Sequence, residues 1–194
     1  MKRIILSIAL LGSFLILADD AFSQETQLSE KDKKKLEKEE KKKQREAAEL
    51  AEWNEAKTMA ESKQFVFTAN EMYTADGSIS LDSRTNFFYV IGDDATLQFT
   101  FVGLQGIPNP NGLGGITSKG KVTKYNYKAD NFKKPVTIEV TVNPLAGQGR
   151  GIHQMVVTIF GDGYAELLMP GNGARLKGRI VKPEDSKIYE GTQL

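Results

Sequence analysis

From Phe65 onward, apolar and polar residues alternate along the chain. The clearest example is residues 136–142, where Val136, Ile138, Val140 and Val142 alternate with two threonines and a glutamate. Successive side chains of a β-strand point to opposite faces of its sheet, so this period of two predicts strands with one buried and one polar face. A polar face on each strand excludes a parallel sheet that is buried on both sides.

Turn residues separate these segments at short intervals. Examples are Gly92-Asp93-Asp94 and Asp162-Gly163, and both residue types tolerate the positive φ values of tight hairpins. We therefore expect about eight or nine strands in a β-domain of residues 64–182, forming an all-β antiparallel meander closed as a small barrel or folded as a sandwich. A domain of about 120 residues buries roughly two-thirds of its unfolded surface, so the absence of cysteine is no obstacle to its stability.

A long charged α-helix is expected before the β-domain, within a spacer of residues 24–63. Residues 28–63 contain no glycine or proline and are rich in lysine, glutamate and alanine, which are good helix formers. Ser29, with Asp32 three residues later, resembles a capping box at the start of the helix.

Charge is unevenly distributed along this helix. Residues 31–45 hold nine basic and four acidic residues, whereas residues 46–61 hold five acidic residues and one basic residue, an order that the helix dipole disfavours. Leu50, Trp53 and Lys57 form a narrow stripe that we expect to dock on the β-domain or on a partner helix. A solvated spacer is the simplest interpretation of the rest; a coiled coil and a segment that contacts anionic lipid or peptidoglycan are the alternatives.

Residues 1–23 have the features of a signal peptide. Lys2 and Arg3 precede an apolar run at residues 4–17, and this run is shorter than the roughly 20 residues that span a bilayer. We expect cleavage between Ser23 and Gln24, which would leave an exported, periplasmic or outer-envelope-associated protein that is soluble and has no transmembrane span. An uncleaved N-terminal anchor is the alternative.

Several segments together resemble a known family. They are FVFTANEMY, NFFYVIGDDATLQF, NGLGG, GKVTKYNYK, VTIEVTV, MVVTIFGDGYAELL and RLKGRIV. Their order is similar to that of an uncharacterised family of exported β-domains from Gram-negative, Bacteroidetes-type bacteria, known as a domain of unknown function. The resemblance covers about Phe65 to Val181, together with the signal peptide and the charged segment that precedes the strands. It implies a fold and export, and it implies no activity.

The composition excludes several kinds of chemistry. A chain with no cysteine and the single histidine His153 has no thiolate or multi-histidine metal site and no cysteine nucleophile. We expect no catalytic, cofactor or metal site, and a net charge of +1 gives no reason to expect nucleic acid as a partner. Arg175, Lys177 and Arg179 alternate on the last predicted strand, where we expect them to protect a sheet edge rather than to form a nucleic-acid platform.

The best candidate for a binding site is the uncharged loop at residues 103–115, which is rich in glycine and proline. Loops of about twelve or more residues in compact domains are usually functional or disordered. The candidate binding residues are Gly103, Leu104, Gln105, Ile107, Asn109, Asn111 and Leu113. Beyond the last strand, residues 183–194 are expected to form a loose polar tail.

These features favour a non-catalytic exported protein of the cell envelope. It is expected to bind either a small apolar ligand in a barrel mouth or a protein partner. The alternative is a structural protein that uses its charged helix as a tether, and a hydrolase of unknown class is a lesser alternative.

Overall fold

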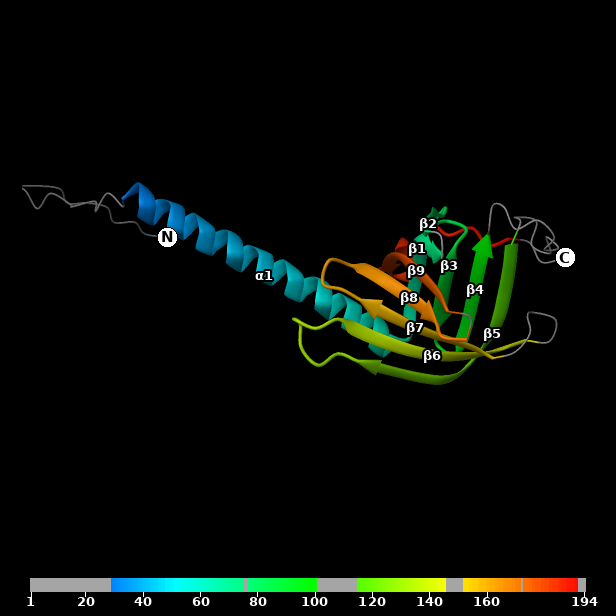
Figure 1. Ribbon diagram of the computed structural model, residues 1–194. Coiled ribbons are helices and arrows are strands. Elements are labelled where there is room, and N and C mark those ends of the chain that lie inside the picture. The colour runs from blue at the N-terminus through cyan, green and yellow to red at the C-terminus, as the bar shows by residue number, and fades with distance from the viewer. Residues whose placement is uncertain (1–28, 75–76, 101–114, 146–151, 172, 192–194) are drawn as a thin grey trace, which may run out of the picture. The chain divides into compact units, whose positions relative to one another are not determined.

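The computed structural model describes residues 29–74, 77–100, 115–145, 152–171 and 173–191. In this part of the chain, helix α1 (Glu30–Ser62) precedes nine strands, and a short 3-10 helix, η1 (Pro183–Asp185), follows them (Figure 1). The strands are β1 (Gln64–Thr74), β2 (Gly77–Ser80), β3 (Phe87–Ile91), β4 (Asp94–Thr100), β5 (Gly115–Lys128), β6 (Val136–Pro144), β7 (His153–Ile159), β8 (Tyr164–Met169) and β9 (Ala174–Val181). The boundary between two compact units falls after Glu40, so α1 from Lys41 onward belongs with the strands.

The strands form one antiparallel sheet that closes on itself. Their order is β2-β1-β3-β4-β5-β6-β7-β8-β9, and β1 also pairs with β9. Eight strands therefore make a closed barrel, while β2 is an additional strand paired with the end of β1. The predicted all-β antiparallel meander after a helix is confirmed, and closure selects the barrel over the sandwich.

Because neighbouring strands are antiparallel, the connections alternate between the two ends of the barrel. The β3–β4, β5–β6 and β7–β8 connections lie at the end where α1 joins β1, which we call the helix end. The β4–β5, β6–β7 and β8–β9 connections lie at the opposite end, which we call the loop end.

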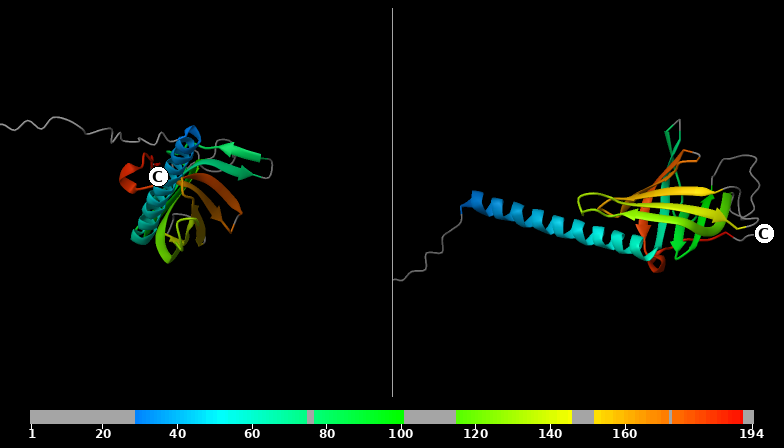
Figure 2. Two further views of the ribbon diagram at one scale, coloured as in Figure 1. Left: turned by 90° about the vertical axis from the view of Figure 1, so that its left-hand side faces the viewer. Right: turned by 90° about the horizontal axis from the view of Figure 1, so that it is seen from below.

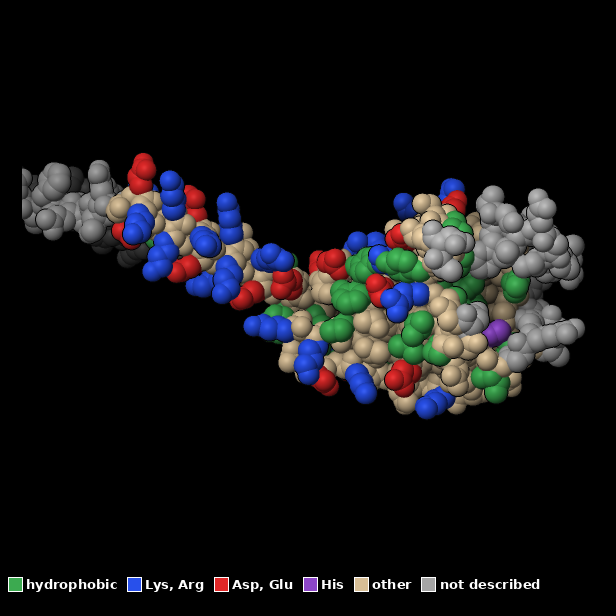
Figure 3. Space-filling model, viewed as in Figure 1, with side chains coloured by type: hydrophobic (Ala, Val, Ile, Leu, Met, Phe, Trp, Pro, Cys, Tyr) green, Lys and Arg blue, Asp and Glu red, His purple; other side chains and the backbone are tan. Residues whose placement is uncertain are grey.

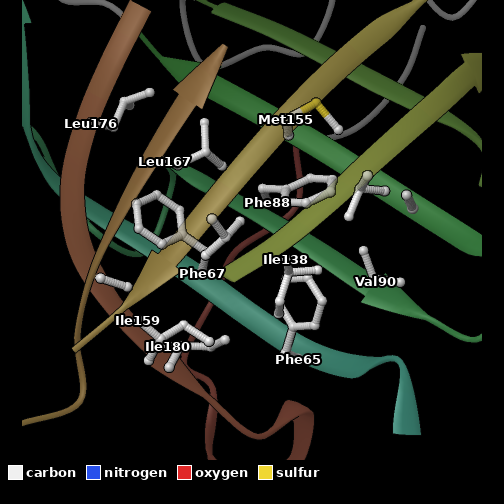
Figure 4. Packing of buried hydrophobic residues seen from close by; sticks show 14 of the residues in the cluster. Phe65, Phe67, Phe88, Val90, Ile138, Met155, Ile159, Leu167, Leu176 and Ile180 are labelled. Carbon is white, nitrogen blue, oxygen red and sulfur yellow. The ribbon is translucent and has the colours of Figure 1, made fainter. Parts of the chain in front are cut away.

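Side chains fill the interior of the barrel (Figure 4). Phe65 and Phe67 of β1 and Phe88 of β3 have no exposed surface. The rings of Phe65 and Phe88 meet edge to face, with their centroids 6.0 Å apart. Met155 and Leu167 approach from the opposite wall and are also buried. This packing is that of an ordinary protein core, in which voids larger than a water molecule are few.

The last turns of α1 pack on the helix end of the barrel. Ala56, Met59 and Ala60 are buried and belong to the same apolar cluster as the barrel interior. The Tyr125 hydroxyl donates a 2.7 Å hydrogen bond to the Ala60 carbonyl, and burial raises the pKa of this phenol, so it remains a donor. Trp53 Nε1 donates to the Lys134 carbonyl at 3.1 Å. The face of α1 that carries Trp53 therefore lies on the β-domain.

The C-terminal residues 183–191, expected to be a loose tail, instead lie along the outside of the barrel (Figure 2, right). We call this segment the C-terminal strap. Its Tyr189 N–H donates a 2.7 Å hydrogen bond to the Arg84 carbonyl, and Glu190 pairs with Lys119. The Glu190 carboxylate raises the pKa of Lys119. The expectation of a loose tail was wrong for the strap, because its polar groups form hydrogen bonds with β4 and an ion pair with β5.

A buried amide joins the strap to the barrel. Gln98 of β4 has no exposed surface, although its place in the alternating pattern is on the polar, outward face. Its Nε2 donates to the carbonyls of Thr85 at 3.0 Å and Tyr189 at 2.9 Å. Its Oε1 accepts hydrogen bonds from Thr117 Oγ1 and from the Gly191 N–H, both at 2.9 Å. All four hydrogen-bonding positions of the amide are therefore occupied.

Candidate functional site

The loop predicted to bind a ligand lies outside the described residues. This applies to all seven candidates, namely Gly103, Leu104, Gln105, Ile107, Asn109, Asn111 and Leu113, so their role stays a prediction. The flanking strands place the ends of the loop, at Thr100 and Gly115, at the loop end of the barrel. The predicted signal peptide also lies outside the described residues. Among those that are described, no helix has an apolar stretch long enough to cross a bilayer.

At the loop end, a serine and a histidine from different strands come into contact, which the sequence pattern did not reveal. Ser118 Oγ of β5 and His153 Nε2 of β7 lie 3.4 Å apart. Burial lowers the pKa of His153, so its imidazole is neutral at pH 7. A histidine that activates a serine is normally oriented by a third group, and no described carboxylate is hydrogen-bonded to His153. The contact is therefore too little to establish a catalytic site.

The basic residues of β9 do not protect a sheet edge, and that prediction was wrong. Strand β9 pairs with β8 on one side and with β1 on the other, so it has no free edge. Lys177 lies over the Tyr73 ring, 4.4 Å from its centroid, and Arg179 Nη2 donates to the Asp162 carbonyl at 2.9 Å. Strand β5, with its lysines, is separated from β9 by three strands in either direction around the barrel. The lysines of β5 (Lys119, Lys121, Lys124 and Lys128) therefore cannot join Arg175, Lys177 and Arg179 in one basic surface.

Carboxylates in the described turns bind neighbouring groups of the chain. Asp93 pairs with Lys63 at 3.2 Å, Asp94 pairs with Lys121 at 2.6 Å, and Asp162 Oδ1 accepts a hydrogen bond from the Tyr164 N–H at 3.0 Å. No group of three potential metal ligands comes together within the described ranges. These aspartates therefore shape turns and anchor strands.

A groove of about 780 Å³ lies between α1 and the helix end of the barrel. One wall is α1, and the other comes from the β5–β6 and β7–β8 connections. The lining residues are Arg45, Glu46, Ala48, Glu49, Glu52, Phe132, Lys133, Phe160, Gly161, Asp162 and Tyr164. Figure 3 shows hydrophobic and acidic side chains together where α1 meets the barrel. A smaller hollow of about 280 Å³ shares Glu52 and Asp162 and extends to Lys182.

The barrel wall of the groove is aromatic. The rings of Phe160 and Tyr164 lie 5.7 Å apart, and Phe160 is 37% exposed. Lys133 Nζ lies 5.7 Å from the centroid of Phe132. Exposed aromatic rings of this kind are enriched in surfaces that bind other proteins.

The charge of the groove is acidic. Four carboxylates, those of Glu46, Glu49, Glu52 and Asp162, face two cations, Arg45 and Lys133. Arg45 Nε is bound to Glu49 Oε1 at 2.8 Å, with both side chains largely exposed, so this pair is weak and exchangeable. Burial and the nearby Glu166, Glu71 and Asp162 carboxylates raise the pKa of Tyr164. The groove thus offers negative charge beside aromatic surface.

Sequence patterns could not have located this groove, because its walls come from three separate parts of the chain. The available signals were single aromatic residues in polar turns, namely Phe132 before two lysines and Phe160 before Gly161-Asp162. An isolated exposed aromatic residue is common on protein surfaces and indicates no site by itself.

Comparison with known proteins agrees with this architecture. A family model described as "Domain of unknown function (DUF4251)" matches residues 46–175, a range that begins within α1. A similar solved structure is described as a DUF4251 family protein from Bacteroides eggerthii DSM 20697. It has 25% sequence identity and a TM-score of 0.54, over 72% of this chain and 93% of that one. A search of the curated proteins found no match. The resemblance inferred from the motif order is confirmed, and the chain belongs to the DUF4251 family.

Proposed function

We propose that this chain is an exported, non-catalytic protein of the cell envelope, and that it binds a basic helical segment of a protein partner in the groove between α1 and the barrel. The observation that carries the proposal is the groove itself, with its aromatic wall and its excess of carboxylates. A non-catalytic role agrees with the incomplete surroundings of Ser118 and His153.

A protein partner is favoured over a small apolar ligand. A ligand in the barrel would have to displace side chains such as Phe67, Phe88 and Met155, which are almost fully buried. The groove, in contrast, borders solvent and combines rings with charges. Ligand pockets for small molecules are mostly apolar and enclosed, whereas aromatic side chains surrounded by a polar, solvent-accessible rim are typical of protein interfaces.

The spacing of the carboxylates favours a helix as the bound element. Glu46, Glu49 and Glu52 follow one another at intervals of three residues on α1, so they form a row along one side of the helix. A partner helix with basic residues at the same spacing would place one cation near each carboxylate. Such charge complementarity speeds association and sets the register of the complex.

Binding is measurable through Trp53, the only tryptophan of the chain, which follows Glu52 on α1. We expect a lysine-rich helical peptide of about 18 residues to change the Trp53 fluorescence of residues 41–194, the compact unit that contains the groove but not most of the lysines of α1, with a dissociation constant on the order of 10 µM at low salt. The double variant Glu49→Gln/Glu52→Gln should weaken this binding about tenfold, because it removes two charge-assisted contacts.

The matched control is Asp94→Asn/Glu139→Gln, which removes the same two negative charges at exposed positions of β4 and β6 that do not line the groove. It should bind the peptide like the unmodified protein. Equal losses in the two double variants, or no fluorescence change with any variant, would refute the groove as the binding site.

Export is the second part of the proposal, and the sequence of residues 1–23 supports it. The mature protein should begin at Gln24 when the full chain is expressed in a Gram-negative host. Mass spectrometry of the periplasmic and envelope fractions measures this directly. A chain that keeps Met1 and stays in the cytoplasm would refute export.

A tethering role is the second candidate, because residues 29–48 are exposed throughout. A tether requires only a solvated helix, so it predicts that deletion of residues 24–44 releases the protein from the envelope fraction while the groove still binds the peptide. A hydrolase of unknown class is the least supported candidate.

A further inference from the structure

We propose that the groove of one copy receives the lysine-rich part of α1 from a second copy, and that two copies exchange these parts to form an antiparallel dimer. The inference rests on the proposed function, since it names the basic helix that the groove binds. It uses two surfaces that every copy of the chain carries.

The first surface is a basic face on the first half of α1. Residues three or four apart share one side of a helix, and six lysines follow this rule. They are Lys31, Lys34, Lys35, Lys38, Lys41 and Lys42, all exposed. The acidic residues of the same stretch, Asp32, Glu37, Glu39 and Glu40, point about a quarter turn or more away from the centre of this face. The face therefore carries only positive charge.

The second surface is the acidic side of the groove, and its spacing matches the basic face. Glu46, Glu49 and Glu52 are three residues apart. Lys42, Lys38 and Lys35 follow one another at steps of four and three residues, in the opposite chain direction. When two helices run antiparallel, Glu49 lies opposite Lys38 and Glu52 opposite Lys35, and Glu46 lies beside Lys42 on the same side of the interface. One register thus satisfies all three carboxylates.

The same pairing accounts for the unfavourable charge order of α1. A helix with a basic first half and an acidic second half opposes its own dipole. In the antiparallel pair, the basic half of each helix lies along the acidic half of the other. Charges that are disfavoured in the single helix then have partners of opposite sign.

The size of the groove agrees with this occupant. Two turns of a helix about 10 Å across take up about 850 Å³, and the groove holds about 780 Å³. Each copy gives one basic face and one groove, so the exchange is reciprocal and is complete with two copies. A two-fold interface of this kind closes and does not continue into a filament.

Charge reversal on either side tests the dimer by sedimentation velocity of residues 24–194. The unmodified protein should be dimeric at about 50 mM salt and should dissociate at about 500 mM, where the Debye length falls well below 10 Å. Lys35→Glu/Lys38→Glu and Glu49→Lys/Glu52→Lys should each weaken the dimer about a hundredfold, since repulsion replaces attraction at both symmetric sites. The lysine-to-glutamate change suits the helix dipole, so helix loss would not explain its effect.

A mixture of the two charge-reversed variants gives the most specific test of the proposed pairing. In one variant positions 35, 38, 49 and 52 are all acidic, and in the other all four are basic, so at these facing positions each variant repels itself and attracts the other. An equimolar mixture should therefore be dimeric although each variant alone is monomeric. The matched control is Lys33→Glu/Lys43→Glu, which makes the same charge change on another side of the same helix and should leave the dimer intact.

A monomeric unmodified protein at low salt would overturn the inference, as would a mixture that stays monomeric. Binding of that monomer to vesicles of anionic phospholipid, lost in Lys35→Glu/Lys38→Glu, would assign the basic face to a lipid surface instead. If the monomer still binds the lysine-rich peptide through Glu49 and Glu52, the proposed function stands and only the second copy is excluded.

Discussion

Replacing Gln98 with leucine is expected to lower the free energy of unfolding by about 3 kcal/mol and to release the C-terminal strap. Leucine keeps most of the volume but none of the four hydrogen bonds of the amide. Each buried polar group that loses its partner costs about 1 to 3 kcal/mol, and release of the strap lets water reach some of these groups. Urea denaturation of residues 24–194 measures the loss.

A second measurement separates strap release from general destabilisation. Trypsin should cut faster after Lys187 in the Gln98→Leu variant, removing residues 188–194 under conditions in which the barrel is resistant. The control is Gln154→Leu at an exposed position of β7, which should change stability by less than about 0.5 kcal/mol. Unchanged stability and unchanged cleavage after Lys187 in Gln98→Leu would contradict the described packing of the strap.

Replacing Gly178 with alanine is expected to cost about 3 to 5 kcal/mol, because the wall of the barrel leaves no room for a Cβ atom there. A Cβ on Gly178 would lie 1.8 Å from the Thr68 carbonyl oxygen and 2.8 Å from the Thr68 carbonyl carbon. Both are backbone atoms of β1, so relief requires the two strands to separate. Thermal unfolding should show a lower midpoint and, because β1 and β9 close the barrel, reduced cooperativity.

Gly178 sits where the barrel closes. It is paired with Ala69 of β1 and with Ala165 of β8, and the β1–β9 register shifts next to Ala69. Bulges and small residues at such points allow a sheet to bend enough to close. Gly171→Ala is the matched control, since a Cβ there meets no atom within 4 Å. A Gly178→Ala protein as stable as this control would contradict the observed closure.

Local patterns predicted the strands well. The alternation at Val136, Ile138, Val140 and Val142 indicates a strand with one buried face, and these four side chains are buried in the barrel. The Gly92 and Gly163 turns have positive φ values of 63° and 69°, as tight hairpins require. These features depend only on residues that are neighbours in the sequence, so the sequence alone was enough to predict them.

Two features depend on contacts between residues that are far apart in the sequence, so the sequence could not show them. They are the closure of the sheet into a barrel and the covering of β4 by the C-terminal strap. The pairing of β1 with β9 joins residues more than 100 positions apart, and without it the same strands suit a sandwich. Thr96 and Gln98 have the polar character of a solvated face, yet both are buried. The strap that binds Gln98 is itself polar, and for this reason it looked like a loose tail.

The candidate site shows the same difference between local features, which the sequence reveals, and long-range packing, which it does not reveal. The sequence directed attention to an uncharged loop at residues 103–115, because loop length and composition are visible along the chain. The groove depends instead on how α1 packs against two hairpin connections. The sequence does contain the uneven charge of α1, which opposes the helix dipole and which the proposed dimer explains.

The most direct test of the groove as a binding site for a basic helix is disulfide formation between two single-cysteine variants, Lys38→Cys and Glu49→Cys. The chain has no other cysteine, so every disulfide must join two copies, and a disulfide requires Cα atoms within about 7 Å of each other. An oxidised equimolar mixture should give a covalent dimer, with much less from either variant alone. Equal dimer from each variant alone and from the mixture, or none from the mixture, would contradict the proposed pairing.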